Sequence, residues 1–509
     1  MTDKAANNRR IAKNTAVLYG RMFVTMGISL YISRVVLRLL GVEDFGIYNV
    51  VGGIVSMFSI ISASMTSAIS RFITFELGRG DEKRLKEVFA TAVSIQIGLA
   101  IAVGLVAEVA GVWFLNTYMN IPAERMGAAN WVLQCSILTF MVKIVSMPYN
   151  AAIIAHERMN AFAYISIVEV VLKLGVALSL EAMTGDRLKA FAVLILCVAA
   201  VVRIIYGIYC KRRFAECSFR FSYNRAITRQ MAGFAGWNFV GSSAAILRDQ
   251  GGNVLLNLFC GPAVNAARGI SLQVNNAVRL FSDNFMMALR PQIIKSYATG
   301  EGNYMMTLVV QGARLCFYLL LLPAVPILVN TEYLLGLWLE TYPEHTAAFV
   351  RLVVVFMLSE SISLPLQTAM QATGKIRDYQ LVVGGLQLLN LPIAWALLHG
   401  GLAPEAVLWT AVGMSQCCLG ARLFMLRRMI ALPVGRYMRQ VYARVVAVAA
   451  VTAAMVRVCA PGGDTSIGGF AMTTVGAVMI TLAVEIVIGC GKAERTLIWN
   501  KLRRRRRQG

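Results

Sequence analysis

The sequence has few charged residues, few histidines and no paired cysteine motif, and each shortage argues against a class of protein. Charged residues make up 15% of the chain and hydrophobic residues 58%, a balance that is foreign to a soluble protein of 509 residues. The ten cysteines are scattered and include no C-x-x-C pair, which argues against a disulfide framework and a zinc site. We therefore predict no catalytic residues, no metal and no cofactor, while a coupling ion such as Na⁺ or H⁺ stays open.

We also predict no removable signal peptide, and the sequence instead contains long apolar runs. The basic start MTDKAANNRRIAKN leads into an apolar run over 15–40 without a small-residue cleavage site. A helix that crosses a bilayer needs roughly 20 apolar residues, and division at polar breaks yields about fourteen such spans. The expected spans are 14–40, 45–77, 88–115, 127–155, 161–182, 190–210, 230–258, 263–289, 304–329, 347–373, 379–398, 406–426, 445–460 and 468–490.

Basic residues alternate strongly between the connections of these spans. Counted from the N-terminus, one set of connections and the two termini hold about 32 of the 49 lysines and arginines, and the other set holds about 4. Because cytoplasmic segments accumulate Lys and Arg, the pattern predicts cytoplasmic termini and an even number of spans. The basic residues of the cytoplasmic segments then explain the net charge of +23, without any need for nucleic-acid binding. We expect the run RRRRR over 503–507 to meet anionic lipid.

A weak internal repeat appears when the sequence is shifted by about 220 residues. The segment LLGVEDFGIYNV (39–50) then lies over FCGPAVNAARGI, and GRGD over TGEG. We predict an all-α integral membrane protein with two pseudo-repeated six-helix bundles, 1–215 and 216–430. Two additional spans and a basic tail follow over 431–509. Internal repeats are common in transporters, where the substrate site lies between the halves.

The span 263–289 and the residue after it carry a polar stripe. At about 100° per residue, one arc of this helix holds Arg268, Asn275, Arg279, Ser282, Asp283 and Arg290. A charge inside the bilayer is costly and usually faces a cavity or a partner. Three arginines exceed what the single Asp283 can neutralise, which favours a cavity. Interhelical ion pairs that serve packing alone are the alternative.

The span 230–258 shows a milder version of the pattern. Asn238, Ser242, Asp249 and Asn253 share a face, with Arg248 beside it. Adjacent helical residues point about 100° apart, so we expect that Arg248 and Asp249 do not form a simple same-face pair. Arg248 is then predicted to reach a cavity or a neighbouring helix, and a buried ion pair with another span is the alternative.

Further charges lie in the first six spans. Arg34 is a candidate cavity residue, whereas Arg38 also fits snorkelling to the outer headgroups. The weaker candidates are Arg38 itself, Arg21, Arg71 and Lys143, and inner-leaflet snorkelling is the alternative for Arg21 and Arg71. Glu169 and Lys173 are spaced i, i+4 and are predicted to pair structurally, with Arg203 able to join them. A surplus of inward cations lowers the cost of taking an anionic headgroup such as a pyrophosphate out of water.

Three segments carry a resemblance to a known family. LYISRVVLRLLGVEDFGIYNVVGGIV (30–55), AHERMNAFAYISIVE (155–169) and LGLWLETYPEHT (335–346) resemble Wzx-type polysaccharide or O-antigen flippases. These flippases share a two-bundle superfamily with lipid II flippases and MATE exporters. The resemblance implies flipping of undecaprenyl-pyrophosphate-linked oligosaccharide from the inner to the outer leaflet by alternating access. It also implies a cationic lumen from helices 1, 2, 7 and 8, which in this sequence hold Arg34, Arg248, Arg268 and Arg279.

The function predicted is therefore a flippase for polysaccharide or lipopolysaccharide biosynthesis in the bacterial inner membrane. Its expected partners are the lipid-linked oligosaccharide, membrane lipids and other polysaccharide assembly proteins, with no nucleic acid. One alternative is an ion-coupled small-molecule exporter of the MATE type, whose cationic substrates would favour an acidic cavity. Another is a membrane enzyme of polysaccharide assembly, but the outward connections offer only Glu344 with His345, and His399, for such chemistry.

Overall fold

The computed structural model describes residues 2–119, 121–217, 224–339, 341–459, 467–491 and 495, and every regular element in them is helical. The predicted all-α class is confirmed, whereas the basic run 503–507 lies outside the described residues. The helices are α1 (Thr2–Ser56), α2 (Ser59–Arg79), α3 (Glu82–Tyr118), α4 (Ala123–Ala155), α5 (Met159–Ser179), η1 (Leu180–Ala182), α6 (Arg187–Arg213), η2 (Ala215–Cys217), α7 (Arg225–Cys260), α8 (Pro262–Ala298), α9 (Gly302–Val329), α10 (Thr331–Leu339), α11 (Thr346–Ser361), α12 (Leu364–Thr373), α13 (Arg377–His399), α14 (Ala406–Ile430), α15 (Val434–Tyr437), η3 (Met438–Tyr442), α16 (Ala443–Cys459), α17 (Ile467–Val484) and η4 (Glu485–Gly489).

Ten stretches of helix in the described residues are long and apolar enough to cross a membrane, and two bent helix pairs raise the number to as many as twelve. The chain is therefore a multi-pass membrane protein. α7 and α8 have 36 and 37 residues, enough length to cross, but they are too polar to be counted among these spans. The number fourteen stays a prediction, which is reached only if these two polar helices also cross.

The helices form two compact units. The first consists of residues 1–239 and 294–300, and the second of residues 240–293 and 301–509. Both α7 and α8 therefore contribute residues to each unit, so the chain passes between the units within these two helices and again after residue 300. The predicted divisions at 215 and 430 stay predictions.

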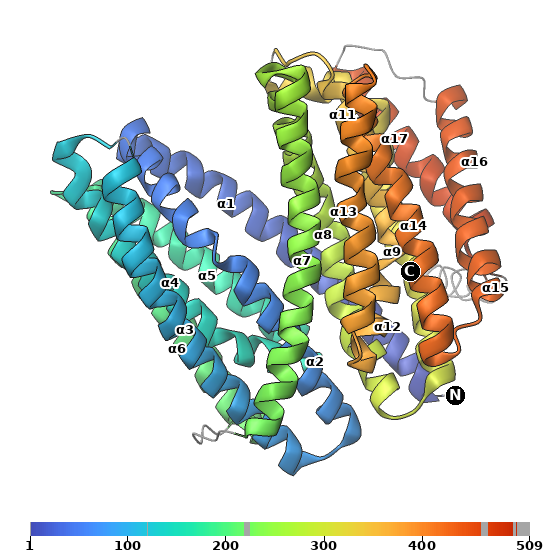
Figure 1. Cartoon of the computed structure of the whole chain (residues 1–509), viewed down its shortest axis with the longest axis horizontal. Coiled ribbons are helices and arrows are strands. Elements are labelled where there is room, and N and C mark those ends of the chain that lie inside the picture. The colour runs from blue at the N-terminus through green and yellow to red at the C-terminus, as the bar shows by residue number, and fades with distance from the viewer. Residues whose placement is uncertain are drawn as a thin grey trace, which may run out of the picture. The chain divides into compact units, whose positions relative to one another are not determined.

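The first unit has α4 at its centre, where α4 packs against α3 and α6 while α1 lies along α5 (Figure 1). Its core is aliphatic and includes Val51, Leu115, Val132 and Leu133. The end of α8 joins this unit through a close approach to α2. A Cβ added at Gly78 would lie 3.1 Å from the Cα of Lys295, so only glycine allows the two backbones to come this near.

The second unit is built around α9 and α14. In it α13 packs along α14, and α9 contacts α11, α12 and α17 (Figure 1). One part of its core gathers Leu256, Phe349, Val353 and Leu408. α16 packs mainly against α17 and makes a smaller contact with α9. The two C-terminal helices are thus attached to the bundle on the side of α9.

Glycines with positive φ occur at matching places in the predicted repeat. Gly41, which breaks the helix α1, has a φ of 79°, and Gly261, between α7 and α8, has a φ of 86°. Gly80 and Gly300 follow α2 and α8 with φ values of 74° and 77°. Residues with a Cβ rarely adopt this conformation, so both pairs use glycine for the same backbone turn at a separation of 220 residues.

Two segments are more irregular than the sequence predicts. The span expected over 347–373 consists of two helices, α11 and α12, bent by 41°. Pro365 lies in the first turn of α12, where its missing N–H is tolerated. Its ring prevents α11 from continuing into α12 as one straight helix. The connection expected over 330–346 contains α10, because TEYLLGLWL has enough apolar residues to form a short packed helix.

Candidate functional site

α8 carries the predicted polar stripe on one continuous helix. It runs unbroken from Pro262 to Ala298, so Arg268, Asn275, Arg279, Asp283 and Arg290 keep their helical register. Their surroundings differ along the helix: Arg268 is buried, Asn275 is half-buried, and Arg279, Asp283 and Arg290 are exposed. The charged residues fall into two groups within the second unit.

The first group joins α7 to α8 through Arg248, Asp249 and Arg268. A guanidinium nitrogen of Arg248 lies 3.0 Å from Oδ1 of Asp249, and its Cζ lies 5.1 Å from the ring centre of Phe356 on α11. These adjacent residues therefore form an ion pair without sharing a helical face, because the long arginine side chain bends across the 100° between them. The contact with α11 agrees with the predicted reach of Arg248 to a neighbouring helix.

Arg268 is the most unusual member of this group. The residue is 7% exposed, and its Nε and Nη1 atoms are buried with no hydrogen-bond acceptor in the described part of the chain. It interacts electrostatically with Asp249, which attracts it, and with Arg248, which repels it. No carboxylate of the described residues lies within ion-pair distance of it. Two arginines therefore share one aspartate, and this group keeps a net positive charge.

The second group lies further along α8. Nε of Arg279 is 3.5 Å from Asp283, a pair one turn apart with both side chains more than half exposed. Asp283 also attracts Arg290, although those two form no ion pair in the described chain. An exposed pair of this kind contributes little to stability. Again two arginines have a single aspartate, so the surplus of cations inferred from the sequence is present in the structure of this helix.

The candidates in the first unit have different surroundings. Arg34 is exposed and has no ion-pair partner in the described residues, whereas Arg38 lies 3.9 Å from Glu181 with both side chains about two-thirds exposed. Arg71 is buried against the rings of Phe72, Phe75 and Phe234, with the nearest ring centre at 4.5 Å. Aromatic packing of this kind holds Arg71 within the bundle.

Arg21 and Lys143 line a polar cavity of about 430 Å³ among α1, α4, α5 and α6. Arg21 donates to Oγ of Ser166 at 3.4 Å and covers the ring of Phe162. Both weaker candidates thus face the interior of a single unit.

The predicted pair of Glu169 and Lys173 is confirmed at 2.5 Å, and Glu169 also lines this cavity. Arg203 does not join the pair; it lies over the ring of Tyr149 at 3.9 Å instead.

Sequence reasoning missed a cluster at one end of the first unit. The side chain of Glu157 is 3% exposed and binds Nζ of Lys295 at 2.7 Å and Arg10 at 3.6 Å. His156 lies 2.6 Å from Glu216 and stacks on Phe214. Partial burial opposes ionisation of Glu216, but hydrogen bonds from His156 and a backbone amide, together with the nearby charges of His156 and Lys86, lower the pKa of this carboxyl. The partners of these ion pairs are 60 to 147 residues apart, so no local pattern reveals them.

The histidine expected to serve an enzyme has another partner. Nδ1 of His345 lies 2.6 Å from Glu405 rather than meeting Glu344, and His399 stacks on Trp395. No group of three or more metal-binding side chains occurs in the described residues.

The long apolar helices define a multi-pass membrane protein, α7 and α8 carry a surplus of arginine, and comparison with known proteins identifies the family. The chain belongs to the polysaccharide biosynthesis protein family, whose model matches residues 11–288. It is 20% identical over 300 residues to the uncharacterized membrane protein EpsK of Bacillus subtilis (strain 168). That match covers 58% of this chain and 59% of EpsK, so it spans less than two-thirds of the relative.

Solved structures of MATE and related transporters share the fold. A MATE protein in the bent conformation has a TM-score of 0.72 at 11% identity, covering 85% of this chain and 97% of its own. An outward-facing multidrug resistance MATE transporter of the MOP superfamily has a TM-score of 0.71 at 13% identity, covering 84% and 97%. A MOP superfamily transporter from Pyrococcus furiosus, described as having a binding pocket of reverse polarity, has 0.69 at 13%, covering 84% and 96%. These likenesses show a shared fold, and the family match agrees with the predicted resemblance to polysaccharide flippases.

Proposed function

We propose that the protein is a flippase that moves an undecaprenyl-pyrophosphate-linked oligosaccharide from the inner to the outer leaflet by alternating access. The observation that carries the proposal is the buried guanidinium of Arg268. Its Nε and Nη1 atoms are donors without an acceptor among the described residues, and its one attractive neighbour, Asp249, already pairs with Arg248. A site of this kind is electrostatically suited to an anion.

A pyrophosphate supplies the hydrogen-bond acceptors and the negative charge that Arg268 lacks. Its oxygens accept from the planar fork of arginine, and such charge-assisted hydrogen bonds are about twice as strong as neutral ones. Leaving a guanidinium buried without a partner is costly, so an arriving anion gains binding energy from satisfying it. Family membership supports a substrate from polysaccharide biosynthesis. The sugars would occupy space beyond the headgroup.

The same proposal places the protein in the bacterial inner membrane with both termini in the cytoplasm, where lipid-linked oligosaccharides are handed on by other assembly proteins. Transport would use no cofactor and would be driven by a coupling ion such as Na⁺ or H⁺. α7 and α8 hold residues of both units, so a change in either helix is transmitted along the chain to both. Alternating access requires such shared elements.

An ion-coupled exporter of small molecules is the second candidate, because the solved neighbours include multidrug transporters. Cationic drugs would meet repulsion from Arg248 and Arg268, which together have only Asp249. The charge of these residues therefore favours an anionic substrate. The enzyme alternative has no supporting cluster in the described residues.

Reconstitution tests the proposal. Purified protein is placed in proteoliposomes that contain the lipid-linked oligosaccharide in one leaflet, and the glycan reaching the other leaflet is measured under Na⁺ and H⁺ gradients. We expect translocation above protein-free liposomes with at least one gradient, and no accumulation of a cationic dye. Dye transport without lipid translocation would establish the exporter instead.

A further inference from the structure

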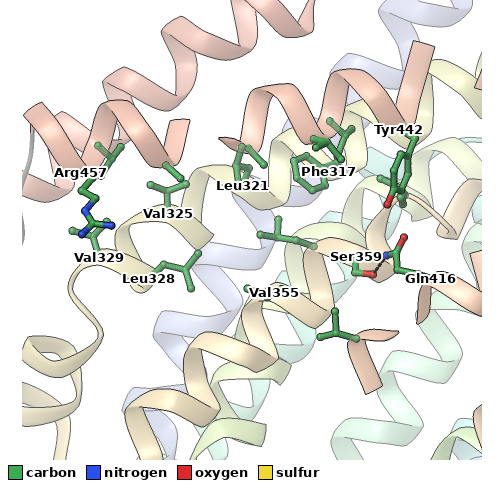
Figure 2. Close-up of a pocket in the computed structure, with 18 residues that line it drawn as sticks. Phe317, Leu321, Val325, Leu328, Val329, Val355, Ser359, Gln416, Tyr442 and Arg457 are labelled. Carbon is green, nitrogen blue, oxygen red and sulfur yellow. Dashed lines mark hydrogen bonds between the residues drawn. The ribbon is translucent and has the colours of Figure 1, made fainter. Parts of the chain in front are cut away.

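An apolar cavity of about 740 Å³ lies within the second unit, among α9, α11, α14 and the segment formed by η3 and α16 (Figure 2). α9 contributes Phe317, Leu321 and Val325 to one wall. The cavity is independent of the arginines of α7 and α8, none of which lines it. It is open on one side and so is accessible to a chain from outside the protein.

The length of the cavity follows one face of α16. Its lining residues Tyr442, Val446, Ala449, Ala453 and Arg457 are spaced four, three, four and four residues apart, so they share a helical face. The fifteen helical steps from Tyr442 to Arg457 correspond to about 22 Å at about 1.5 Å per step. One leaflet of the hydrocarbon core is about 15 Å thick, half of about 30 Å. The cavity is therefore long and narrow rather than round.

The walls require hydrocarbon rather than water. A buried water needs two to four polar partners, and the polar lining is sparse, with Ser359 and Gln416 already bonded to each other. Ser359 bonds to Ser415, and the amide of Gln416 donates to Ser359. An empty apolar space of this size would forfeit packing along every wall. The bilayer around the protein supplies a chain that fills it.

One end of the cavity has a charge, and the other has none. Figure 2 shows Arg457 at one end, beside Val325 and Val329, and Tyr442 with Ser359 and Gln416 at the other. Arg457 is two residues from the end of α16 at Cys459, and no carboxylate of the described residues pairs with it. An arginine at a helix end offers its planar fork to a phosphate.

We propose that this groove holds one hydrocarbon chain of an anionic bilayer phospholipid, whose phosphate binds Arg457. The lipid is a resident component that fills the space between α16 and the bundle and keeps the two C-terminal helices in place. It is distinct from the transported substrate, so this proposal stands or falls independently of the flippase function. The alternative for Arg457 is simple snorkelling to the headgroup layer, with no selection of a lipid.

Native mass spectrometry of the full chain, released from detergent after incubation with phosphatidylglycerol, tests the proposal. We expect one retained phosphatidylglycerol per protein. Ala453→Phe, which fills the groove, is expected to lower its retention about tenfold or more, which corresponds to about 1.4 kcal/mol. Ala454→Phe is the matched control, because Ala454 is exposed, does not line the groove and lies one residue away. Arg457→Gln is expected to remove the preference for phosphatidylglycerol over phosphatidylethanolamine.

Each other outcome overturns the proposal. Equal retention of phosphatidylglycerol by Ala453→Phe and Ala454→Phe would place the lipid elsewhere. An unchanged lipid preference in Arg457→Gln would show that Arg457 only snorkels to the headgroup layer. Displacement of phosphatidylglycerol by a polyisoprenyl phosphate, one for one, would assign the groove to the substrate chain. Size-exclusion profiles and melting temperatures confirm that the variants are folded, and Ala449→Leu replaces Ala453→Phe if that variant unfolds.

Discussion

Two buried arginines of the second unit differ in their partners. Arg422 is 1% exposed and lies 3.5 Å from Glu360, although its Nε atom is buried without a hydrogen-bond acceptor in the described residues. Arg268 is 7% exposed, and both its Nε and its Nη1 are buried without an acceptor in the described chain. The two residues therefore differ in having or lacking a carboxylate within ion-pair distance, and this difference can be tested.

Replacing each arginine by methionine measures this difference. Arg422→Met leaves Glu360 without its cation, and we expect a loss of about 3 kcal/mol in the free energy of unfolding, as for other broken buried pairs. Arg268→Met removes a charge without such a partner and is expected to leave stability unchanged or raised. Thermal unfolding in detergent gives both values. A larger loss from Arg268→Met than from Arg422→Met would make Arg268 a structural residue.

Arg279 and its neighbour test the stripe on α8 by function. Arg279 lies on the charged face, and Leu280 is exposed about 100° around the helix. Arg279→Ala is expected to reduce lipid translocation about tenfold, while Leu280→Ala at equal expression stays near the wild-type rate. The initial rate in proteoliposomes is the measurement. Equal rates for the two variants would remove this part of the stripe from the substrate site.

Elements of the first unit are held at one end by Arg125 at the start of α4. Its guanidinium bonds to Asp44 at 2.9 Å and to Asp186 at 3.3 Å. Asp186 also caps α6 by accepting from the backbone amides of Leu188 and Lys189. Partial burial opposes ionisation of Asp186, but the Lys189 amide and the Arg125 guanidinium together lower the pKa of this carboxyl.

Removal of this cap has a predictable cost and pH dependence. Asp186→Ala is expected to lose more than about 1 kcal/mol of stability, because a helix cap and an ion pair disappear together. Asp81→Ala is the control, since Asp81 caps α3 through the amide of Arg84 and has no second cation of this kind. A depressed carboxyl pKa stabilises fully above about pH 4 and loses its effect as pH falls through the folded pKa. Unfolding of the two variants across pH 3 to 7 would contradict the account if Asp81→Ala showed the larger loss.

The end of α8 offers a second test at the level of elements. Glu157 binds Lys295 of α8 and Arg10 of α1. Glu157→Gln is expected to cost on the order of 2 kcal/mol, less than a fully buried pair because both cations stay partly exposed. Glu87→Gln removes the exposed pair with Arg84 and is expected to cost under about 0.5 kcal/mol. The melting temperatures of both variants measure these two losses. Equal losses would show that the ion pairs of Glu157 do not hold the end of α8.

Most elements could be predicted from the sequence, because long apolar runs directly report the length of a crossing helix. The exceptions depend on shape or on distant partners. Pro365 bends one expected span, and the partner of Lys295 lies 138 residues away in Glu157. Helical periodicity correctly gathered the α8 stripe, but it did not reveal the ion pair of Arg248 with Asp249, since side-chain flexibility exceeds what a helical wheel describes. Burial of Arg268 without an acceptor became visible only in three dimensions.

At the scale of the whole molecule, the chain shares the fold of MATE transporters and carries a surplus of arginine on α7 and α8. An exporter of cationic drugs would instead benefit from acidic residues in its binding site. α7 and α8 hold four arginines named here and two aspartates, and both helices contribute residues to each compact unit. The polarity of these two helices keeps them out of the set of apolar spans, although α8 is as long as any helix that follows α1 and α7 is one residue shorter.

The rate of lipid translocation by Arg268→Gln is the measurement that tests the central claim most directly. Wild type, Arg268→Gln and the exposed control Arg351→Gln are reconstituted at equal density, and undecaprenyl-pyrophosphate-linked oligosaccharide is followed from one leaflet to the other. The account predicts that Arg268→Gln loses about tenfold or more of the rate, while Arg351→Gln keeps the wild-type rate. Wild-type translocation no faster than in protein-free liposomes, or an Arg268→Gln variant as fast as wild type, would contradict it.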